Sequence, residues 1–230
     1  MLLPLHDQNP LRIIPFQIVT FVVIALCVVV FLYQQVLSME QEQALLLSFG
    51  MLPAVLFEHR ELAPALVILP AELTLLSSMF LHGGWMHLIG NMAFLWIFGD
   101  NVEDSMGHWR FLVFYCICGM LASLTHALAL SDSISPLIGA SGGVSGVLGA
   151  YLMLHPRVKI LCLVMMRLPL RLPAYLMIGL WVGFQLFNIV TGAGGDTAWW
   201  AHIGGFIAGV VLIPFFKFDS VPLFDRGTRH

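Results

Sequence analysis

Two serines and one histidine have the types and spacing that nucleophilic catalysis needs. Gly-x-Ser-Gly occurs twice, at Ser141 and Ser145, within a nearly chargeless stretch of small residues from 139 to 151. His202 begins a second small-residue stretch, Ala-His-Ile-Gly-Gly. Small residues four apart also let helices pack closely in lipid, so packing alone could account for the serines. Two such helices in contact, one with a hydroxyl and one with an imidazole, would form a candidate nucleophile and base.

The composition indicates that these stretches lie in an integral membrane protein. Of the 230 residues 59% are hydrophobic and 10% are charged, with a mean hydropathy of +0.91. Soluble domains carry about 25% charged residues. The net charge of −3 is small and mixed, so nucleic acid is not an expected partner. We expect no cofactor and no metal site, since Cys116 and Cys118 are two apart and point in different directions on a helix.

Apolar segments of about 20 residues can cross a bilayer as helices. We predict an all-α polytopic membrane protein with six spans, at 13–33, 85–98, 111–130, 139–154, 173–190 and 201–216. The predicted organisation is an N-terminal tail 1–12, a helical domain 13–216 with a long first loop 34–84, and a C-terminal tail 217–230. We expect short helices in the first loop, a charged turn at 100–110 and an interfacial segment at 160–166.

The distribution of Lys and Arg between the two sides of the membrane tests this topology. With the N-terminus inside, nine of the ten Lys and Arg residues fall in inner segments, and only Arg60 falls outside. That asymmetry is what the positive-inside rule predicts. Six spans place both termini on the same, cytoplasmic side.

The predicted topology brings the candidate residues to one side of the membrane. Spans two, four and six run in the same direction, so their first residues lie near the outer face. His87 begins span two, Ser141 span four and His202 span six. His87 and Asn91 are four apart and share one face of a helix. Gly142 and Gly205 would let the serine and histidine helices approach closely.

The residue inventory excludes several hydrolase classes. No Asp or Glu lies in the six predicted spans, which rules out an intramembrane aspartyl protease. A zinc protease would need His-Glu-x-x-His on a helix, and an α/β-hydrolase would need strands and an acidic triad member. A serine–histidine dyad remains, in which Ser141 attacks a carbonyl and His202 transfers the proton. Because no acid is available, His202 must be held by packing or neutral hydrogen bonds.

The remaining parts of such a site can also be assigned. His87, Asn91 and the backbone N–H of Ser141 could stabilise an oxyanion. Ser145 lies one turn deeper than Ser141, and its N–H is bonded within the helix. The first serine is therefore the expected nucleophile.

The segments 82–91 (HGGWMHLIGN), 139–142 (GASG) and 201–205 (AHIGG) resemble the three motifs of rhomboid intramembrane serine proteases. The resemblance extends from residue 72 to about 216 and preserves the order of the motifs. It implies a rhomboid-like six-helix bundle, with Ser141 as nucleophile, His202 as base, and His87 and Asn91 at the oxyanion. His82 matches a histidine with a structural role. The implied substrates are transmembrane segments of membrane proteins, cut near the outer face.

Two positions depart from many family members, and two other functions remain open. Leu73-Thr74 stands where many members carry Trp-Arg, and Ser145 where some carry Tyr. A non-catalytic rhomboid-like protein that binds membrane clients is an alternative, although such proteins typically lack the serine or histidine. A small proton or metal transporter is disfavoured by the absence of carboxylates from the predicted spans. We expect the protein in a bacterial inner (plasma) membrane. The sequence does not indicate its oligomeric state.

Overall fold

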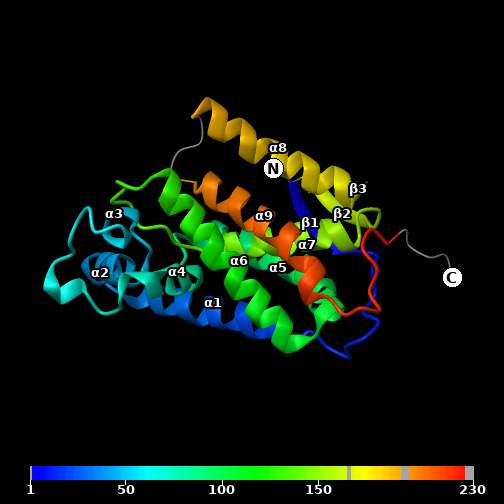
Figure 1. Ribbon diagram of the computed structural model, residues 1–230, viewed down its shortest axis with the longest axis horizontal. Helices are drawn as coiled ribbons and strands as arrows, with labels where there is room; N and C mark the ends of the chain where they lie inside the picture. The colour runs from blue at the N-terminus through cyan, green and yellow to red at the C-terminus, as the bar shows by residue number, and fades with distance from the viewer. Residues whose placement is uncertain (1, 165–166, 193–196, 226–230) are drawn as a thin grey trace.

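The computed structural model describes residues 2–164, 167–192 and 197–225. The protein is elongated, and different elements lie at the two ends of its long axis (Figure 1). The short helices of the first loop lie at one end, called here the loop end, and a small β-sheet lies at the other, the sheet end. Helix α9 (Trp199–Phe216) begins toward the loop end and finishes toward the sheet end.

The long helices agree in position with the predicted spans. They are α1 (Ile18–Val36), α5 (Trp85–Met106), α6 (His108–Ala129), α7 (Ser141–Leu154), α8 (Ala174–Thr191) and α9. Helices α1, α6, α8 and α9 are long and apolar enough to cross a membrane. The 14 residues of α7 rise about 21 Å at 1.5 Å each, less than the roughly 30 Å of a bilayer core. The described residues therefore support four candidate spans, and the count of six is not confirmed.

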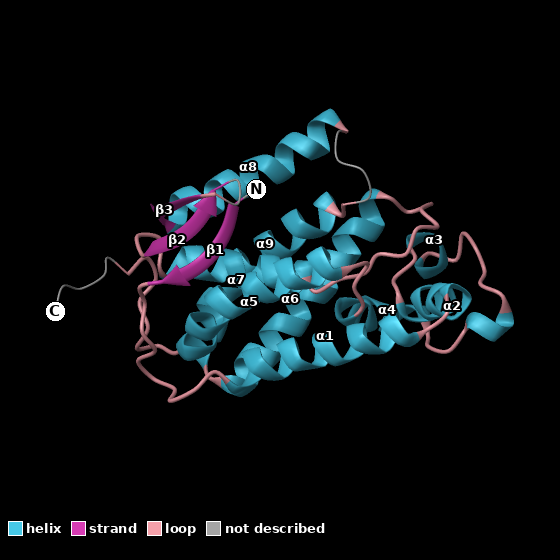
Figure 2. Ribbon diagram, turned by 180° about the vertical axis from the view of Figure 1, so that it is seen from behind, coloured by secondary structure: helices cyan, strands magenta, loops and turns pink. Residues whose placement is uncertain are grey.

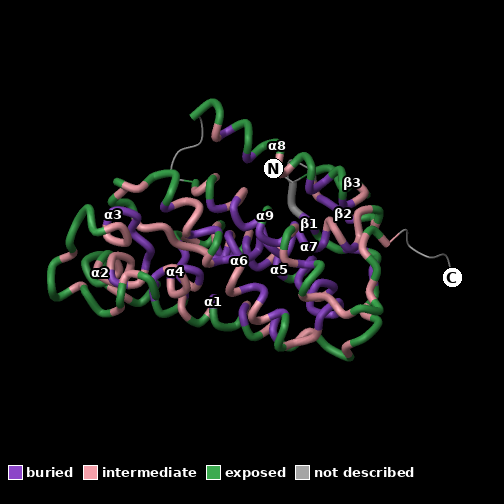
Figure 3. Tube along the Cα trace, in the orientation of Figure 1, coloured by how far each residue is buried: buried purple, intermediate pink, exposed green. Residues whose placement is uncertain are grey.

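Helix α7 lies at the centre of the bundle, against α5, α6 and α9. Buried residues are concentrated in the middle of the fold, whereas α8 runs along the outside and is largely exposed (Figure 3). Helices α7 and α9 touch through their backbones. A side chain at Gly205 would overlap the carbonyl of Gly142, and one at Gly209 would overlap the carbonyl of Gly146. The small residues thus bring the serine and histidine helices into direct contact, as predicted.

The sheet corrects the prediction of an all-α fold (Figure 2). Strands β1 (Leu2–Asp7), β2 (Lys159–Val164) and β3 (Leu168–Pro173) pair antiparallel in the order β1-β2-β3. The predicted tail 1–12 therefore contains a strand, and so does the predicted interfacial segment 160–166, of which residues 165–166 lie outside the described residues. A short apolar run does not distinguish a strand from a buried helix segment, and β1 pairs with a strand more than 150 residues away.

The first loop contains short helices, as predicted. They are α2 (Met39–Phe49), α3 (Pro53–Leu56) and α4 (Thr74–Ser77), with single 3₁₀ turns at η1 (Pro64–Leu66), η2 (Ala71–Leu73) and η3 (Ser78–Phe80). Gln34, near the end of α1, forms two hydrogen bonds with the backbone at the end of this loop. Its amide nitrogen donates to the carbonyl of His82 at 3.0 Å, and its oxygen accepts from the backbone N–H of His82 at 3.1 Å. The segment that leads into α5 is thereby held against α1.

The predicted charged turn at 100–110 is wrong. Helix α5 continues through Met106, and α6 begins at His108 after the single residue Gly107. Gly107 has a φ of +81°, a conformation that glycine adopts without a steric penalty. Carboxylates consequently lie within a long helix, which the sequence analysis did not expect.

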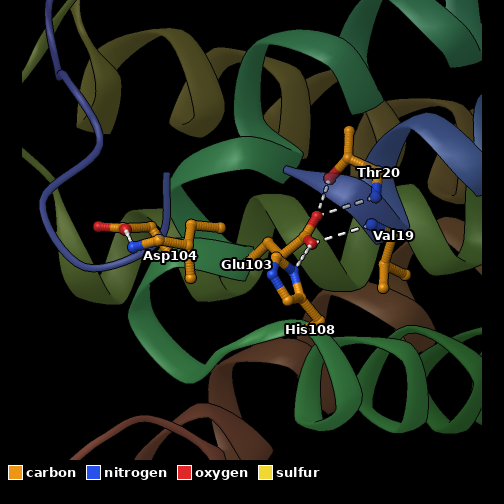
Figure 4. Close-up of polar contacts among 6 residues, drawn as sticks. Val19, Thr20, Glu103, Asp104 and His108 are labelled. Carbon is orange, nitrogen blue, oxygen red and sulfur yellow. Dashed lines mark hydrogen bonds and ion pairs between the residues drawn. The ribbon is translucent and has the colours of Figure 1, made fainter. Parts of the chain in front are cut away.

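One of these carboxylates, Glu103, ties α5 to the start of α1 (Figure 4). It is fully buried, and it accepts from the backbone N–H groups of Val19 at 2.9 Å and Thr20 at 2.8 Å, and from the Thr20 hydroxyl at 2.8 Å. His108 Nδ1 lies 2.5 Å from Glu103 Oε1, the oxygen that also accepts from Val19. The first N–H groups of a helix lack partners within the helix and attract negative charge. Glu103 therefore satisfies the N-terminus of α1 from inside the protein.

Candidate active site

Ser141 is the first residue of α7, directly after a sharp backbone turn. Gly139, two residues earlier, has a φ of +118° and donates its N–H to the carbonyl of Ser78 at 2.9 Å. The backbone N–H of Ser141 lies in the first helical turn, where no acceptor exists within the helix. Its side chain is half-buried, whereas Ser145 is buried.

His202 is the fourth residue of α9, and Gln185 of α8 holds it. Its Nδ1 lies 2.8 Å from Gln185 Oε1. The indole rings of Trp181 and Trp199 lie 5.9 Å and 6.0 Å from the imidazole, centre to centre. The neutral hydrogen bond expected for His202 is therefore present, together with aromatic packing.

Gln185 was missed by the sequence analysis. It is only 2% exposed, although it belongs to a helix that is exposed along most of its length. The available indication was the presence of Gln185 and Asn188 in an otherwise apolar segment of 18 residues. An amide buried in such a segment needs hydrogen-bond partners.

His87 and Asn91 lie together beside the turn that precedes Ser141. A Cβ atom on Gly139 would stand 2.6 Å from His87 Nε2 and 3.7 Å from Asn91 Nδ2. Only glycine therefore allows this close approach. His87 Nδ1 accepts a long, 3.4 Å hydrogen bond from the N–H of Gly83, so the proton of a neutral ring lies on Nε2.

The amide nitrogen of Asn91 is a buried donor without a partner. Asn91 is 8% exposed, and its Nδ2 has no hydrogen bond to any described residue. Buried polar atoms are nearly always satisfied, and exceptions often mark sites where function supplies the partner. This donor lies within reach of the residues just before Ser141.

Two further observations place His202 near the same residues. His87 and His126 lie close enough to His202 for a charge on one ring to affect the others. Gly205, which touches the carbonyl of Gly142, lies three residues after His202 and so on the same side of α9. Within the described residues no hydrogen bond joins the Ser141 hydroxyl to His202. Catalytic hydrogen bonds are often long in the free enzyme and shorten when substrate binds.

His82 packs against His87 on its buried side. It is fully buried, and its Nδ1 donates to the carbonyl of Phe80 at 3.3 Å. Its ring meets that of His87 edge to face, 5.2 Å between centres. With its backbone fixed by Gln34, His82 can limit the movement of His87.

The carboxylates of α5 take no part in this cluster. Glu103 and Asp104 lie near the end of α5 at the sheet end, away from its start at Trp85. Asp104 accepts from the N–H groups of Arg12, Ile13 and Ile14 at 2.7–3.0 Å. Over the described ranges no group of three His, Cys, Asp or Glu residues is arranged to hold a metal ion. The candidate residues at the loop end therefore offer the hydroxyl of Ser141 together with imidazoles and amides.

Comparison with known proteins finds similarity to rhomboid proteins in each case. The family model of the Rhomboid domain matches residues 71–217. Rhomboid protein 1, mitochondrial, of Saccharomyces cerevisiae is 34% identical over 151 residues, which cover 61% of this chain and 41% of that protein. Rhomboid protease GluP of Bacillus subtilis is 34% identical over 137 residues, 59% of this chain and 24% of that protein. RHOMBOID-like protein 5 of Arabidopsis thaliana is 40% identical over 78 residues, which cover 34% of this chain and 25% of that protein. The matched part of the chain thus spans less than half the length of these relatives.

Proposed function

The chain belongs to the rhomboid family, and on that premise we propose that it is an intramembrane serine protease with Ser141 and His202 as its catalytic dyad. The substrates are transmembrane segments of membrane proteins, cleaved near the outer face of the bilayer. The observation that carries the proposal is the unpartnered amide of Asn91 beside the turn before Ser141. An oxyanion formed on a carbonyl attacked by Ser141 would supply the missing acceptor.

The first half of the reaction forms an acyl-enzyme. Ser141 Oγ attacks the scissile carbonyl carbon while its proton passes to His202 Nε2. The carbonyl oxygen becomes negative and accepts from Asn91 Nδ2, His87 Nε2 and the N–H of Ser141. His202 then gives the proton to the leaving nitrogen as the peptide bond breaks.

The second half returns the enzyme to its initial state. A water molecule gives a proton to His202 and attacks the acyl carbon. The same three donors stabilise the second oxyanion. The bond to Ser141 Oγ breaks, the proton returns from His202 to that oxygen, and the new carboxyl end departs. Within the protein, only Ser141 and His202 need to gain or lose a proton.

Charge supports the proposed orientation, in which the sheet end faces the cytoplasm. The described basic residues at or next to the sheet end are Arg12, Arg110, Arg157, Lys159, Arg167, Arg171 and Lys217, whereas Arg60 lies in the first loop. Such an asymmetry marks the cytoplasmic side of a membrane protein. Both tails, 1–12 and 217–230, would then be cytoplasmic, and the membrane domain would be 13–216. The relatives include a mitochondrial protein of yeast and a protein of Bacillus subtilis. The bacterial inner (plasma) membrane remains our proposal for the location, and fractionation of cells that express the tagged protein would test it.

Proteolysis in a defined bilayer tests the proposal. The purified protein is reconstituted into liposomes with a single-span substrate, and the products are mapped by mass spectrometry. We expect cleavage within or at the outer edge of the substrate's span, and none with Ser141→Ala or His202→Ala. Thermal unfolding of both variants checks that they are folded. Unchanged cleavage by either folded variant, in preparations free of contaminating protease, would rule out the dyad; binding of substrate without cleavage by the parent protein would favour a non-catalytic rhomboid-like protein.

A further inference from the structure

We propose that Gln185 of α8 is a positioning residue that fixes the tautomer of His202. The proposal rests on the proposed function and deepens it, since it identifies what replaces the acidic member of a triad. A base that takes the serine proton through Nε2 must carry its own proton on Nδ1. In a Ser–His–Asp triad a carboxylate accepts from Nδ1–H, and here the neighbour of Nδ1 is an amide, which can either donate or accept.

The backbone of α8 determines which way this amide faces. Gln185 Nε2 donates to the carbonyl of Trp181 at 3.1 Å. A carbonyl oxygen can only accept, so the NH₂ side of the amide must face Trp181. This contact settles an orientation that the shape of an amide does not reveal.

The amide orientation in turn determines the tautomer. With NH₂ turned to Trp181, Gln185 Oε1 faces His202 Nδ1 at 2.8 Å. An oxygen without a proton can only accept, so Nδ1 must be the donor. In the neutral ring Nε2 is then unprotonated and can accept a proton from Ser141. A chain of two hydrogen bonds thus runs from a main-chain carbonyl of α8 to the base on α9.

Burial makes this chain of hydrogen bonds costly to break. Gln185 is 2% exposed, and a buried amide left without hydrogen-bond partners loses its hydration without compensation. The Trp181 and Trp199 rings also restrict the imidazole. The other groups that interact with His202 electrostatically, His87 on α5 and His126 on α6, are imidazoles. No described carboxylate forms an ion pair with His202, so the Gln185 amide is its partner at Nδ1.

Two substitutions separate positioning from packing. Gln185→Leu keeps the approximate volume and removes the acceptor, which lets His202 exchange tautomers. Gln185→Glu keeps an acceptor and adds a negative charge, which stabilises the imidazolium. The matched control is Asn188→Leu, since Asn188 is also buried on α8 but donates to Phe184 O at 2.7 Å.

The activity measurements use liposomes and the single-span substrate. We expect Gln185→Leu to lower kcat about tenfold with little change in KM, a fraction of the 10²–10⁴ that a positioned base contributes. Gln185→Glu should retain activity at high pH and shift the acid limb of the pH–rate profile to higher pH, because the base works only when neutral. Asn188→Leu should keep the parent kcat and pH profile. Equal kcat and equal pH profiles in Gln185→Leu and Asn188→Leu would overturn the proposal.

A spectroscopic measurement tests the tautomer without reference to proteolysis. Protein labelled with ¹⁵N-histidine is studied in detergent micelles in the Ser141→Ala background, and the His202 signals are assigned by their loss in His202→Gln. We expect a protonated Nδ1 and an unprotonated Nε2, and a mixture of tautomers after Gln185→Leu. A proton on Nε2 in the neutral ring would overturn the proposal, even if the protein is a protease. The expected tautomer in a protein that cleaves nothing would support the contact and overturn the proposed function instead.

Discussion

The hydroxyl of Ser145 donates to the backbone carbonyl of Ser141 at 2.6 Å. The second Gly-x-Ser-Gly copy is thus engaged within its own helix, and Ser145 is only 1% exposed. The hydroxyl of Ser141, one turn earlier, lies at the start of α7. The repeated signature therefore contains one serine with a structural bond and one that is available for chemistry.

Ser145→Ala should leave most of the proteolytic activity intact. The substitution removes one hydrogen bond to a carbonyl that already accepts within the helix, at a cost of about 0.5–1.5 kcal/mol of stability. Initial rates of substrate cleavage and the unfolding temperature measure the two effects. Complete loss of activity in a folded Ser145→Ala protein would contradict the assignment of roles.

Gly209→Ala should separate α7 from α9. The added Cβ would overlap the backbone of Gly146, which cannot move aside as a side chain can. We expect a loss of about 1–3 kcal/mol in the free energy of unfolding and a marked loss of activity. Gly179→Ala on α8 is the control, because nothing lies within 4 Å of a Cβ there. Similar unfolding curves for the two variants would show that the helix contact is not required.

Asn91→Ala should lower kcat far more than it changes KM. The amide has no described partner in the free protein, so it contributes most when charge develops on the substrate. Loss of one oxyanion donor costs about 10²–10³-fold in kcat. Steady-state kinetics in liposomes distinguish the two parameters. A change confined to KM would assign Asn91 to substrate binding instead.

Acid should destabilise the protein through His155, which follows the last residue of α7. Burial lowers the pKa of His155 to about 4 from 6.5, against the opposing influence of Asp225 and Asp104. The unfolded chain therefore takes up this proton first as the pH falls, and the stability from neutral His155 is lost between about pH 6.5 and 4.

His155→Phe tests this pH dependence. Phenylalanine keeps the edge-to-face contact with Tyr151, 5.3 Å between ring centres, and cannot take up a proton. Denaturant unfolding at pH 7 and pH 5 should show a smaller loss of free energy in the variant than in the parent. An identical loss would show that other groups cause the acid sensitivity.

Much of the helical framework is predictable because the apolar segments are long and local. The backbone contact between α7 and α9 also follows from glycines four residues apart. The sheet does not, since β1 pairs with residues more than 150 positions away and its short sequence contains Pro4. Glu103 appears in the sequence as part of a charged turn, because only the fold brings Val19 and Thr20 to its carboxylate.

Residue type and spacing were enough to propose the candidate dyad, but not the residues that hold it in place. Ser141 and His202 belong to small-residue stretches that stand out in the sequence. Gln185 is a single amide in an apolar helix, and its role depends on the Trp181 carbonyl and on the distance to His202. The contact between Gln185 and His202 joins side chains of two helices and, unlike the glycine contact of α7 with α9, has no local sequence pattern.

Covalent labelling by a serine-reactive fluorophosphonate tests directly whether Ser141 is the nucleophile. An activated serine reacts with this probe, whereas an ordinary serine does not. Mass spectrometry of the labelled protein should place the adduct on Ser141, and Ser141→Ala and His202→Ala should remain unlabelled while folded. Ser145→Ala should label like the parent. An adduct on Ser145, or undiminished labelling of folded His202→Ala, would show that Ser141 and His202 do not form the catalytic dyad.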